Sequence, residues 1–218
     1  MQSRQTSMHV TNRQGVQLAD YAREHGVTRE DFTKFLTDKE AVKNFLNGLK
    51  TDPEWFTKLQ AEAVKIGGRV HKLDVPVNYT RSHNDAALAG GPQTDSTYNV
   101  LKVGGLYTSR ENKTVTETIV LFNWPKGGGS YDKAVAFGLA NGLDKTVPHE
   151  AFAVGEHFPK LNYDLGPNPM YVVETTGCSF DGELQACGVW WDDARRKSGL
   201  NWQSVFGRGR DWFAFRKK

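Results

Sequence analysis

Apolar residues recur at helical spacing through the first third of the chain. The segment 16–24 has apolar residues at this spacing and is followed by Gly26, a residue type suited to ending a helix. Two pairs have the three-residue spacing of a capping box, Thr28 with Asp31 and Thr37 with Glu40. After the second pair, apolar residues at i, i+3, i+4 and i+7 form one face: Val42, Phe45, Leu46 and Leu49. These patterns predict short amphipathic helices.

A further helix is expected to begin at Asp52-Pro53. Its apolar stripe consists of Phe56, Leu59, Ala63 and Val64, and Gly67-Gly68 ends it. The pattern then changes from helical to strand periodicity. We therefore expect a helical segment over residues 1–68 and an α+β domain over residues 69–218. From this boundary we predict that residues 1–68 are dispensable for folding of the remainder.

Strand patterns follow the two glycines. Apolar residues alternate from Leu73 to Tyr79 around Pro76, and because proline cannot donate to a ladder, this strand should lie at a sheet edge. Residues 82–96 are polar and rich in small residues, which predicts a surface loop. Residues 100–107 and 114–124 read as strands, and the second should be central because its end is apolar on both faces.

The last third alternates between helix and strand signals. Three glycines at 127–129 precede a helix over 132–140, and Pro148 in a first turn opens another that runs towards His157. Asp181-Gly182 is a strong hairpin signal between strands over 171–178 and 184–191, and residues 212–215 form a closing strand. The fold class is therefore α+β with an antiparallel sheet.

The length of the hairpin turn determines how the two cysteines are placed relative to each other. With a two-residue turn Cys178 faces Gln185 and lies diagonal to Cys187, whereas a four-residue turn would place the cysteines opposite one another. We predict the diagonal register and free thiols, since intracellular proteins seldom keep disulfides. The polar N-terminus lacks the apolar core of a secretory signal, and no stretch is long and apolar enough for a membrane span. We expect a cytoplasmic protein with no membrane partner.

Charge is unevenly distributed in the 218-residue chain. Its net charge is +3, but the segment from Ala194 to the C-terminus has eight basic side chains against one acidic one, which leaves −4 for the rest. Such asymmetry is typical of a surface that meets something acidic, although basic tails that only keep a protein soluble are common.

No pattern of catalytic or cofactor-binding residues stands out. His149 and His157 are too far apart for a helical zinc motif, and they are more simply explained as exposed helix-end side chains. The segment 126–130 lacks the Gly-Lys-Ser/Thr ending of a phosphate-binding loop, and a flexible turn explains it better. We expect no metal and no cofactor. An enzyme without a recognisable motif is the third-ranked hypothesis.

Aromatic and basic residues crowd together near the C-terminus. Strand alternation sends Trp190 and Trp191 to opposite faces, so about half of the aromatic residues should be core. Exposed aromatic rings beside arginines bind sugars, nucleobases or a partner's side chains. The expected binding face comprises Trp191, Trp202, Arg195, Arg196, Arg208 and Arg210, with Trp202 as its anchor in a loop before the closing strand. The leading hypothesis is a non-enzymatic module that binds a protein or other macromolecule, and the second is a single-stranded nucleic-acid-binding protein.

Two resemblances accompany this hypothesis. The half of the chain from Thr114 onward, with the segments 119–123, 146–150 and 155–159, resembles a family of short uncharacterised proteins of candidate-phylum bacteria and their phages. That family implies no catalytic residue. Residues 189–217 are similar to the end of C-type-lectin-like domains, where an aromatic-rich loop precedes a terminal Phe-Arg strand. The paired active-site cysteines of the enzymatic branch are absent there, so this similarity implies binding.

Overall fold

The computed structural model describes residues 26–39, 54–108 and 112–218. The chain divides into two compact units, residues 1–56 and residues 57–218. In the first unit, helix α2 (Arg29–Thr37) begins after Thr28, whose hydroxyl accepts a hydrogen bond from the Asp31 amide as the capping spacing predicts. The helices predicted over 16–24 and after Thr37 lie outside the described residues.

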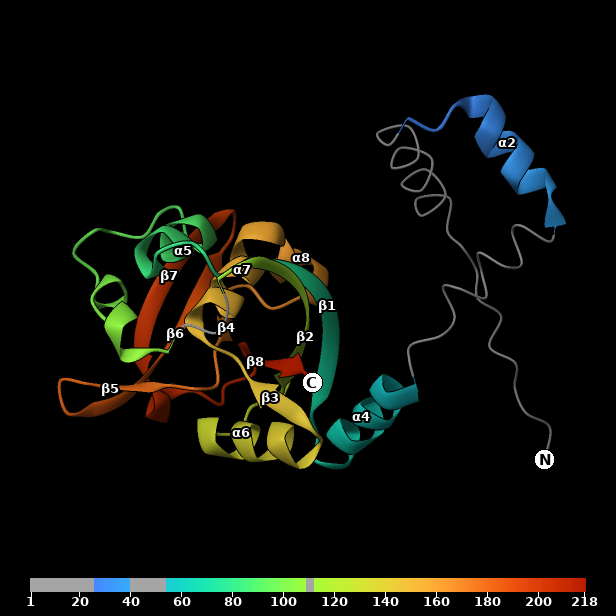
Figure 1. The fold of residues 1–218 in the computed structure, drawn as a ribbon. Helices are drawn as coiled ribbons and strands as arrows, with labels where there is room; N and C mark the ends of the chain where they lie inside the picture. The colour runs from blue at the N-terminus through green and yellow to red at the C-terminus, as the bar shows by residue number, and fades with distance from the viewer. Residues whose placement is uncertain (1–25, 40–53, 109–111) are drawn as a thin grey trace. The chain divides into compact units, whose positions relative to one another are not determined.

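The second unit is an α+β domain, and the predicted fold class is confirmed (Figure 1). Helix α4 (Glu54–Lys65) lies across the division between the units. The other helices are α5 (His83–Gly90), α6 (Tyr131–Ala140), α7 (Pro148–His157) and α8 (Leu161–Leu165), with short 3-10 helices η1 (Asn99–Leu101), η2 (Gly104–Leu106) and η3 (Gln203–Val205). The strands are β1 (Arg69–Asn78), β2 (Thr114–Asn123), β3 (Leu143–Lys145), β4 (Met170–Val173), β5 (Cys178–Phe180), β6 (Glu183–Asp192), β7 (Arg195–Trp202) and β8 (Asp211–Lys217).

The eight strands found in the described residues form one mixed, mostly antiparallel sheet. Its order is β1-β2-β8-β4-β6-β5, while β3 pairs with β8 and β7 pairs with β6. The pairing of β4 with β8 is parallel. Strand β1 is an edge strand, as Pro76 predicts, and β2 lies between β1 and β8, as its apolar composition predicts.

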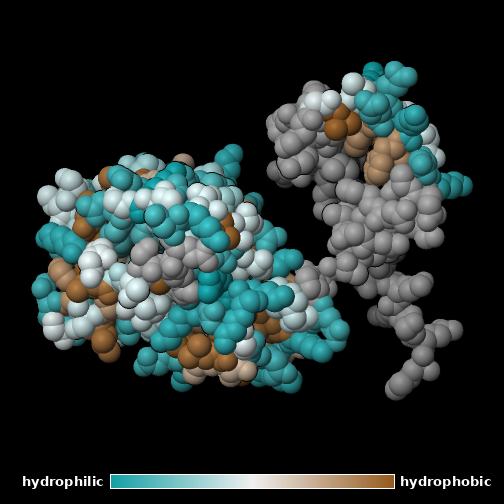
Figure 2. All heavy atoms as spheres, in the orientation of Figure 1, coloured by the Kyte–Doolittle hydropathy of each residue, from teal (hydrophilic) through white to brown (hydrophobic). Residues whose placement is uncertain are grey.

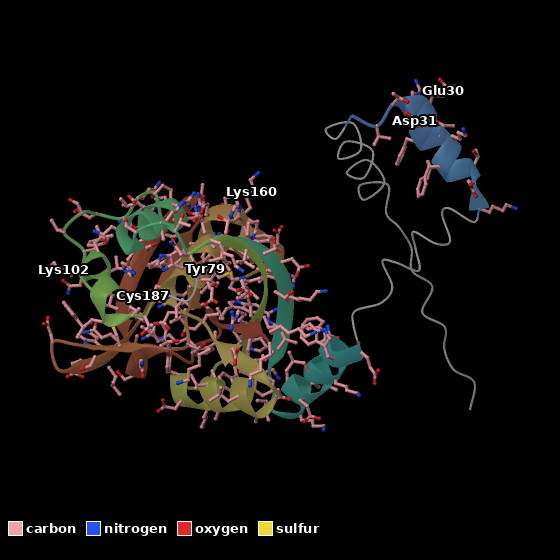
Figure 3. All side chains as sticks on the ribbon, viewed as in Figure 1. Glu30, Asp31, Tyr79, Lys102, Lys160 and Cys187 are labelled. Atoms are coloured by element: carbon pink, nitrogen blue, oxygen red, sulfur yellow. The ribbon has the colours of Figure 1, made fainter. Side chains whose placement is uncertain are left out.

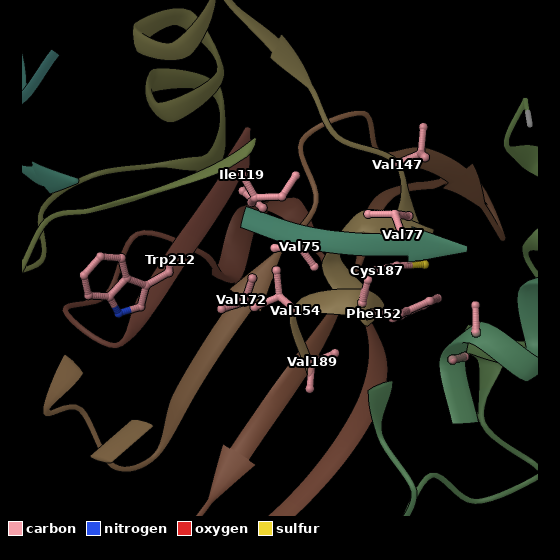
Figure 4. Close-up of a cluster of buried hydrophobic side chains, with 14 of the residues drawn as sticks. Val75, Val77, Ile119, Val147, Phe152, Val154, Val172, Cys187, Val189 and Trp212 are labelled. Atoms are coloured by element: carbon pink, nitrogen blue, oxygen red, sulfur yellow. The ribbon is translucent and has the colours of Figure 1, made fainter. Parts of the chain in front are cut away.

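Helices cover the sheet from two sides (Figure 1). Helices α5 and α7 pack on one face over the main core, where Val75, Ile119, Val154, Val172 and Trp212 are buried (Figure 4). On the opposite face Phe122 of β2 stacks on Phe137 of α6 at a ring-centroid distance of 4.3 Å. Both faces of β2 are therefore buried, which explains the continuous apolar run at its end.

Two sequence predictions on local structure between β1 and β2 are wrong. The expected loop 82–96 contains helix α5, which is capped by Ser82 through the Asp85 amide. This helix approaches α7 closely, because a Cβ on Gly90 would lie 2.6 Å from the Phe152 carbonyl oxygen. The expected strand 100–107 instead contains η1 and η2, and Val100 of η1 and Val103, just before η2, are buried in the core at a spacing of three residues.

The predicted turn and register of the hairpin are confirmed, but the strand expected over 171–178 is two strands, β4 and β5, separated by residues 174–177. Asp181 and Gly182 both have positive φ, and Cys178 pairs with Gln185, so the two-residue turn sets the register. Cys178 and Cys187 are both free and buried. Within the described ranges no helix is both long and apolar enough to span a membrane. The visible surface of the second unit is mostly hydrophilic, with an apolar patch over α6 (Figure 2).

Candidate functional site

An aromatic layer runs along the sheet face that carries α6 and continues beyond that helix. Phe213 contacts Tyr131 and Phe206 in this layer, and Phe206 contacts Tyr171 at a centroid distance of 5.4 Å. The next strand carries Trp190, which is 43% exposed. The aromatic layer is thus covered near β2 and β8 and open near β6 and β7.

Strand register places residues of this face in one row, from the buried Asp211 and Tyr171 to the exposed Trp190. Asp211 of β8 pairs with Tyr171 of β4, Tyr171 pairs with Trp190 of β6, and Trp190 pairs with Lys197 of β7. Directly paired residues project from the same face of a sheet. The Lys197 ammonium lies 5.8 Å from the ring centroid of Tyr98, so the row ends in a cation–π contact.

Two facing glycines make room for the Tyr171 ring. Gly188 pairs with Gly199, and a Cβ on Gly188 would lie 2.5 Å from the Tyr171 ring carbon Cε1. The Tyr171 hydroxyl accepts a hydrogen bond from Asn201 Nδ2 at 2.9 Å and donates one to the Gly199 carbonyl at 3.3 Å. The ring is therefore held flat along the sheet, where it forms the floor of a groove beside Trp190.

Three adjoining surface pockets share Trp190. One of about 110 Å³ lies between Tyr171, Phe206 and the arginines 208 and 210; one of about 240 Å³ lies beside Asp192 and Arg195; and one of about 340 Å³ lies along β7 beside Tyr98. We call this surface the Trp190 groove. Its floor and walls are formed by Tyr98, Tyr171, Trp190, Lys197 and Asn201, and its rim by Arg195, Arg208 and Arg210.

The charges around the Trp190 groove are mostly basic. Arg195 forms an ion pair with Asp192 and remains well exposed. The Asp211 carboxylate accepts hydrogen bonds from the amides of Gly207 and Arg208, at 3.0 and 2.8 Å, and its pKa is raised by burial. Asp211 thus fastens the loop that carries Arg208 and Arg210, and those two side chains form one end of the rim.

The structure brings together three of the six residues predicted for the binding face. Arg195, Arg208 and Arg210 line the groove. Trp191 does not, because strand alternation turns it into the main core, where it is fully buried. Arg196 also projects to that side, where its guanidinium donates to the Gly155 carbonyl of α7 and burial lowers its pKa.

Trp202 is exposed, as expected, but its position differs from the predicted one. It is the last residue of β7 and not a loop residue, and it pairs with Gln185. It projects from the face opposite to Trp190 and is absent from the three pockets. The sequence interpretation missed Trp190, Lys197 and Tyr98 as groove residues. The alternation at Trp190-Trp191 was the available signal, but it does not tell which indole faces solvent.

A second cluster of polar groups is buried and has a structural role. Cys187 and Tyr79 lie in the interior (Figure 3). The Glu174 carboxylate accepts hydrogen bonds from the amides of Thr176, Gly177 and Cys187 and from the Tyr107 hydroxyl. Burial raises the pKa of Cys187 well above its ordinary value, so its thiol stays protonated and is a poor nucleophile.

The acidic residues near α7 also have structural partners, as does His149, whose Nε2 lies 3.1 Å from the Arg81 carbonyl oxygen. Glu150 is fully buried and accepts hydrogen bonds from the Val147 amide and the Tyr79 hydroxyl. Glu156 forms an ion pair with Arg81. In the part of the chain that the structure describes, no three His, Cys, Asp or Glu side chains are grouped so as to hold a metal ion.

No protein-family model, curated protein or solved structure matches the chain. The two resemblances seen in the sequence stay predictions, and the Trp190 groove is the feature of the described residues from which a function can be inferred.

Proposed function

We propose that residues 57–218 form a recognition module without catalytic activity, which binds an anionic protein or other anionic macromolecule in the Trp190 groove. The observation that carries this proposal is the exposed indole of Trp190, placed between Tyr171 and Lys197 in a groove with three arginines on its rim. Aromatic residues and arginines supply most of the energy at recognition surfaces.

The polar composition of the groove supports binding over catalysis. Its hydrogen-bonding groups, such as Asn201 and the Tyr171 hydroxyl, bond to one another and hold the floor in place. The buried carboxylates Glu150 and Glu174 lie elsewhere and are occupied by internal donors. A cytoplasmic location is part of the proposal, and the free thiols of Cys178 and Cys187 are in keeping with a reducing compartment.

Single-stranded nucleic acid is the second candidate partner. It is favoured by one observation, the exposed Trp190 ring beside Lys197, because nucleobases stack on such rings while cations contact the phosphates. The two candidates differ in salt dependence, since each phosphate contact to a single strand contributes about 0.7 to the slope of log affinity against log salt.

The test uses two tryptophans of similar exposure. Trp190 and Trp202 are 43% and 55% exposed, but only Trp190 lines the groove. We expect immobilised poly-L-glutamate to bind the wild-type protein and Trp202→Ala equally well. Trp190→Ala and the double variant Arg208→Gln/Arg210→Gln should bind about tenfold more weakly, the size of effect typical of a central anchor.

Three other outcomes are informative. Tighter binding of oligo-dT, with the single-strand salt slope and the same loss in Trp190→Ala, would make nucleic acid the partner. Loss of binding in Trp202→Ala alone would show that Trp202 is the anchor residue, as predicted from the sequence. Failure of the wild-type protein to bind either probe would contradict an anionic partner.

A further inference from the structure

The backbone of β7 has a free edge beside the Trp190 groove. In β7 the amide and carbonyl of Ser198 point away from β6, because both are bonded to the Thr94 hydroxyl. The direction of these groups repeats every second residue along a strand. The corresponding groups of Leu200 and the amide of Trp202 therefore also point away from β6.

A neighbouring segment covers only part of this edge. Pro92 forms a bridge with Lys197, and the Gln93 amide donates to the Arg196 carbonyl. The chain then leaves β7 through Tyr98 and η1. Within the described residues, no group donates to the Leu200 carbonyl or accepts from the amides of Leu200 and Trp202. Unpaired edge groups of this kind are a template for another strand.

The space beside the free edge is a pocket and belongs to the Trp190 groove. This pocket, of about 340 Å³, is bounded by Leu200 and Asn201 on one side and by Tyr98 and Asn99 on the other. In a strand added here, side chains opposite Gly199 and Asn201 would project to the same face as Lys197 and Trp190. The other side chains would lie beside Leu200 on the opposite face.

We propose that the partner is an acidic peptide that binds in extended conformation, adds a strand to β7 at Leu200 and Trp202, and places acidic side chains against Lys197 and Arg195. This inference rests on the proposed function and names the class of its partner. Main-chain pairing supplies affinity in such complexes, and alternate side-chain contacts supply specificity.

The backbone edge favours a peptide over a nucleic acid. A single strand of nucleic acid has no alternating amide and carbonyl groups to pair with Leu200 and Trp202. The groove has Arg195, Lys197, Arg208 and Arg210 against Asp192 and the buried Asp211, which favours acidic over basic side chains in the partner.

The experiment begins with selection from a displayed library of random dodecapeptides on the full chain. We expect enriched sequences with Asp or Glu at alternate positions. Each enriched peptide is then synthesised and titrated against wild-type protein, Trp190→Ala, Trp202→Ala and Trp202→Pro. The last two variants both lack the indole, but only proline also lacks the edge amide.

The backbone at Trp202 suits this comparison. Its φ of −59° is the value that proline prefers, and Asn201 lies in a strand, as the residue before a proline should. We expect Trp202→Pro to bind the peptide about fivefold or more weakly than Trp202→Ala, as for a lost hydrogen bond. Equal affinities of the two variants would overturn strand addition.

A second measurement decides the matter even when Trp202→Pro fails to fold. Two versions of the peptide are synthesised, one N-methylated at every odd-numbered backbone amide and the other at every even-numbered one. Strand addition requires that one of these versions no longer binds while the other binds nearly as well as the unmethylated peptide. Equal loss of binding in both methylated versions, or enrichment of peptides without acidic residues, would overturn the inference. A peptide whose binding is weakened by Trp190→Ala, but not selectively by Trp202→Pro or by either pattern of N-methylation, would contradict strand addition alone. The proposed function would then still hold.

Discussion

Gly188 determines where the Tyr171 ring can lie. A Cβ at this position would approach the Val172 carbonyl oxygen to 2.2 Å and the Tyr171 ring to 2.5 Å. Neither the neighbouring strand nor the ring can move without loss of packing. We predict that Gly188→Ala lowers the free energy of unfolding by about 1–3 kcal/mol, as is typical of overpacking.

Urea denaturation measures this effect, with Gly105→Ala as the matched control. A Cβ on Gly105 has no atom within 4 Å, so the control should retain the wild-type midpoint. Equal midpoints for both variants would show that the sheet accommodates a side chain at Gly188 and that the ring is not fixed there.

Some residue-level features were predictable and others depended on the tertiary structure. The alternation of Trp190 and Trp191 follows from strand geometry, but which face is covered depends on helices that are distant from these residues in the sequence. Helices α5 and α7 cover the side of Trp191, whereas α6 packs on β3 and β8 and Trp190 stays 43% exposed. Lys197 and Tyr98 meet only in the folded chain, so no local pattern shows their contact.

The connection between β4 and β5 depends on one buried carboxylate. Burial raises the pKa of Glu174 from 4.5 to about 7, although hydrogen bonds from Gly177 and Tyr107 oppose the shift. The folded state therefore binds this proton more tightly than the unfolded state. The resulting stabilisation is fully present below pH 4.5 and is lost as the pH rises through 7.

Glu174→Gln tests this dependence because its side chain does not titrate. From pH 4.5 to 8, we expect the unfolding free energy of the wild-type protein to fall by about 3 kcal/mol relative to that of Glu174→Gln. Chemical denaturation at several pH values measures the difference, and other titrating groups cancel because both proteins contain them. A constant difference would mean that Glu174 has an ordinary pKa.

For helices and strands, the residues at their ends and turns predicted the structure better than the composition of the segments between them. The Thr28 cap, the proline at the start of α7 and the Asp181-Gly182 turn are local chemistry, and the structure has each of them. Ser82 with Asp85 has the same capping spacing, but the small residues that follow resemble a loop. They form α5 because small side chains allow close packing on α7.

For the whole molecule, helix α4 decides where the domain begins. Leu59 and Ala63 are 3% and 0% exposed, the Gly68 amide donates to the Ala63 carbonyl, and the Trp124 indole donates to the Ile66 carbonyl. Most of α4 therefore belongs to the unit of residues 57–218, although the sequence placed the boundary after Gly68. The switch in periodicity marks a change of secondary structure and says nothing of what the preceding helix packs against.

Two truncated chains separate these boundaries. A chain that begins at Pro53 keeps α4 whole, and we expect it to melt cooperatively at the temperature of the full chain's second unit. A chain that begins at Arg69 exposes the surface that Leu59 and Ala63 cover, and burial of one leucine side chain alone contributes about 1.5–3 kcal/mol. It should therefore be less soluble, and differential scanning calorimetry should show a melting temperature several degrees lower.

Leu59→Ala in the full chain is the matched control. It removes the same contact without shortening the chain, so it should also lower the melting temperature. Equal melting temperatures for the two truncated chains would restore the boundary at Gly68 and make residues 1–68 dispensable, as the sequence alone predicts.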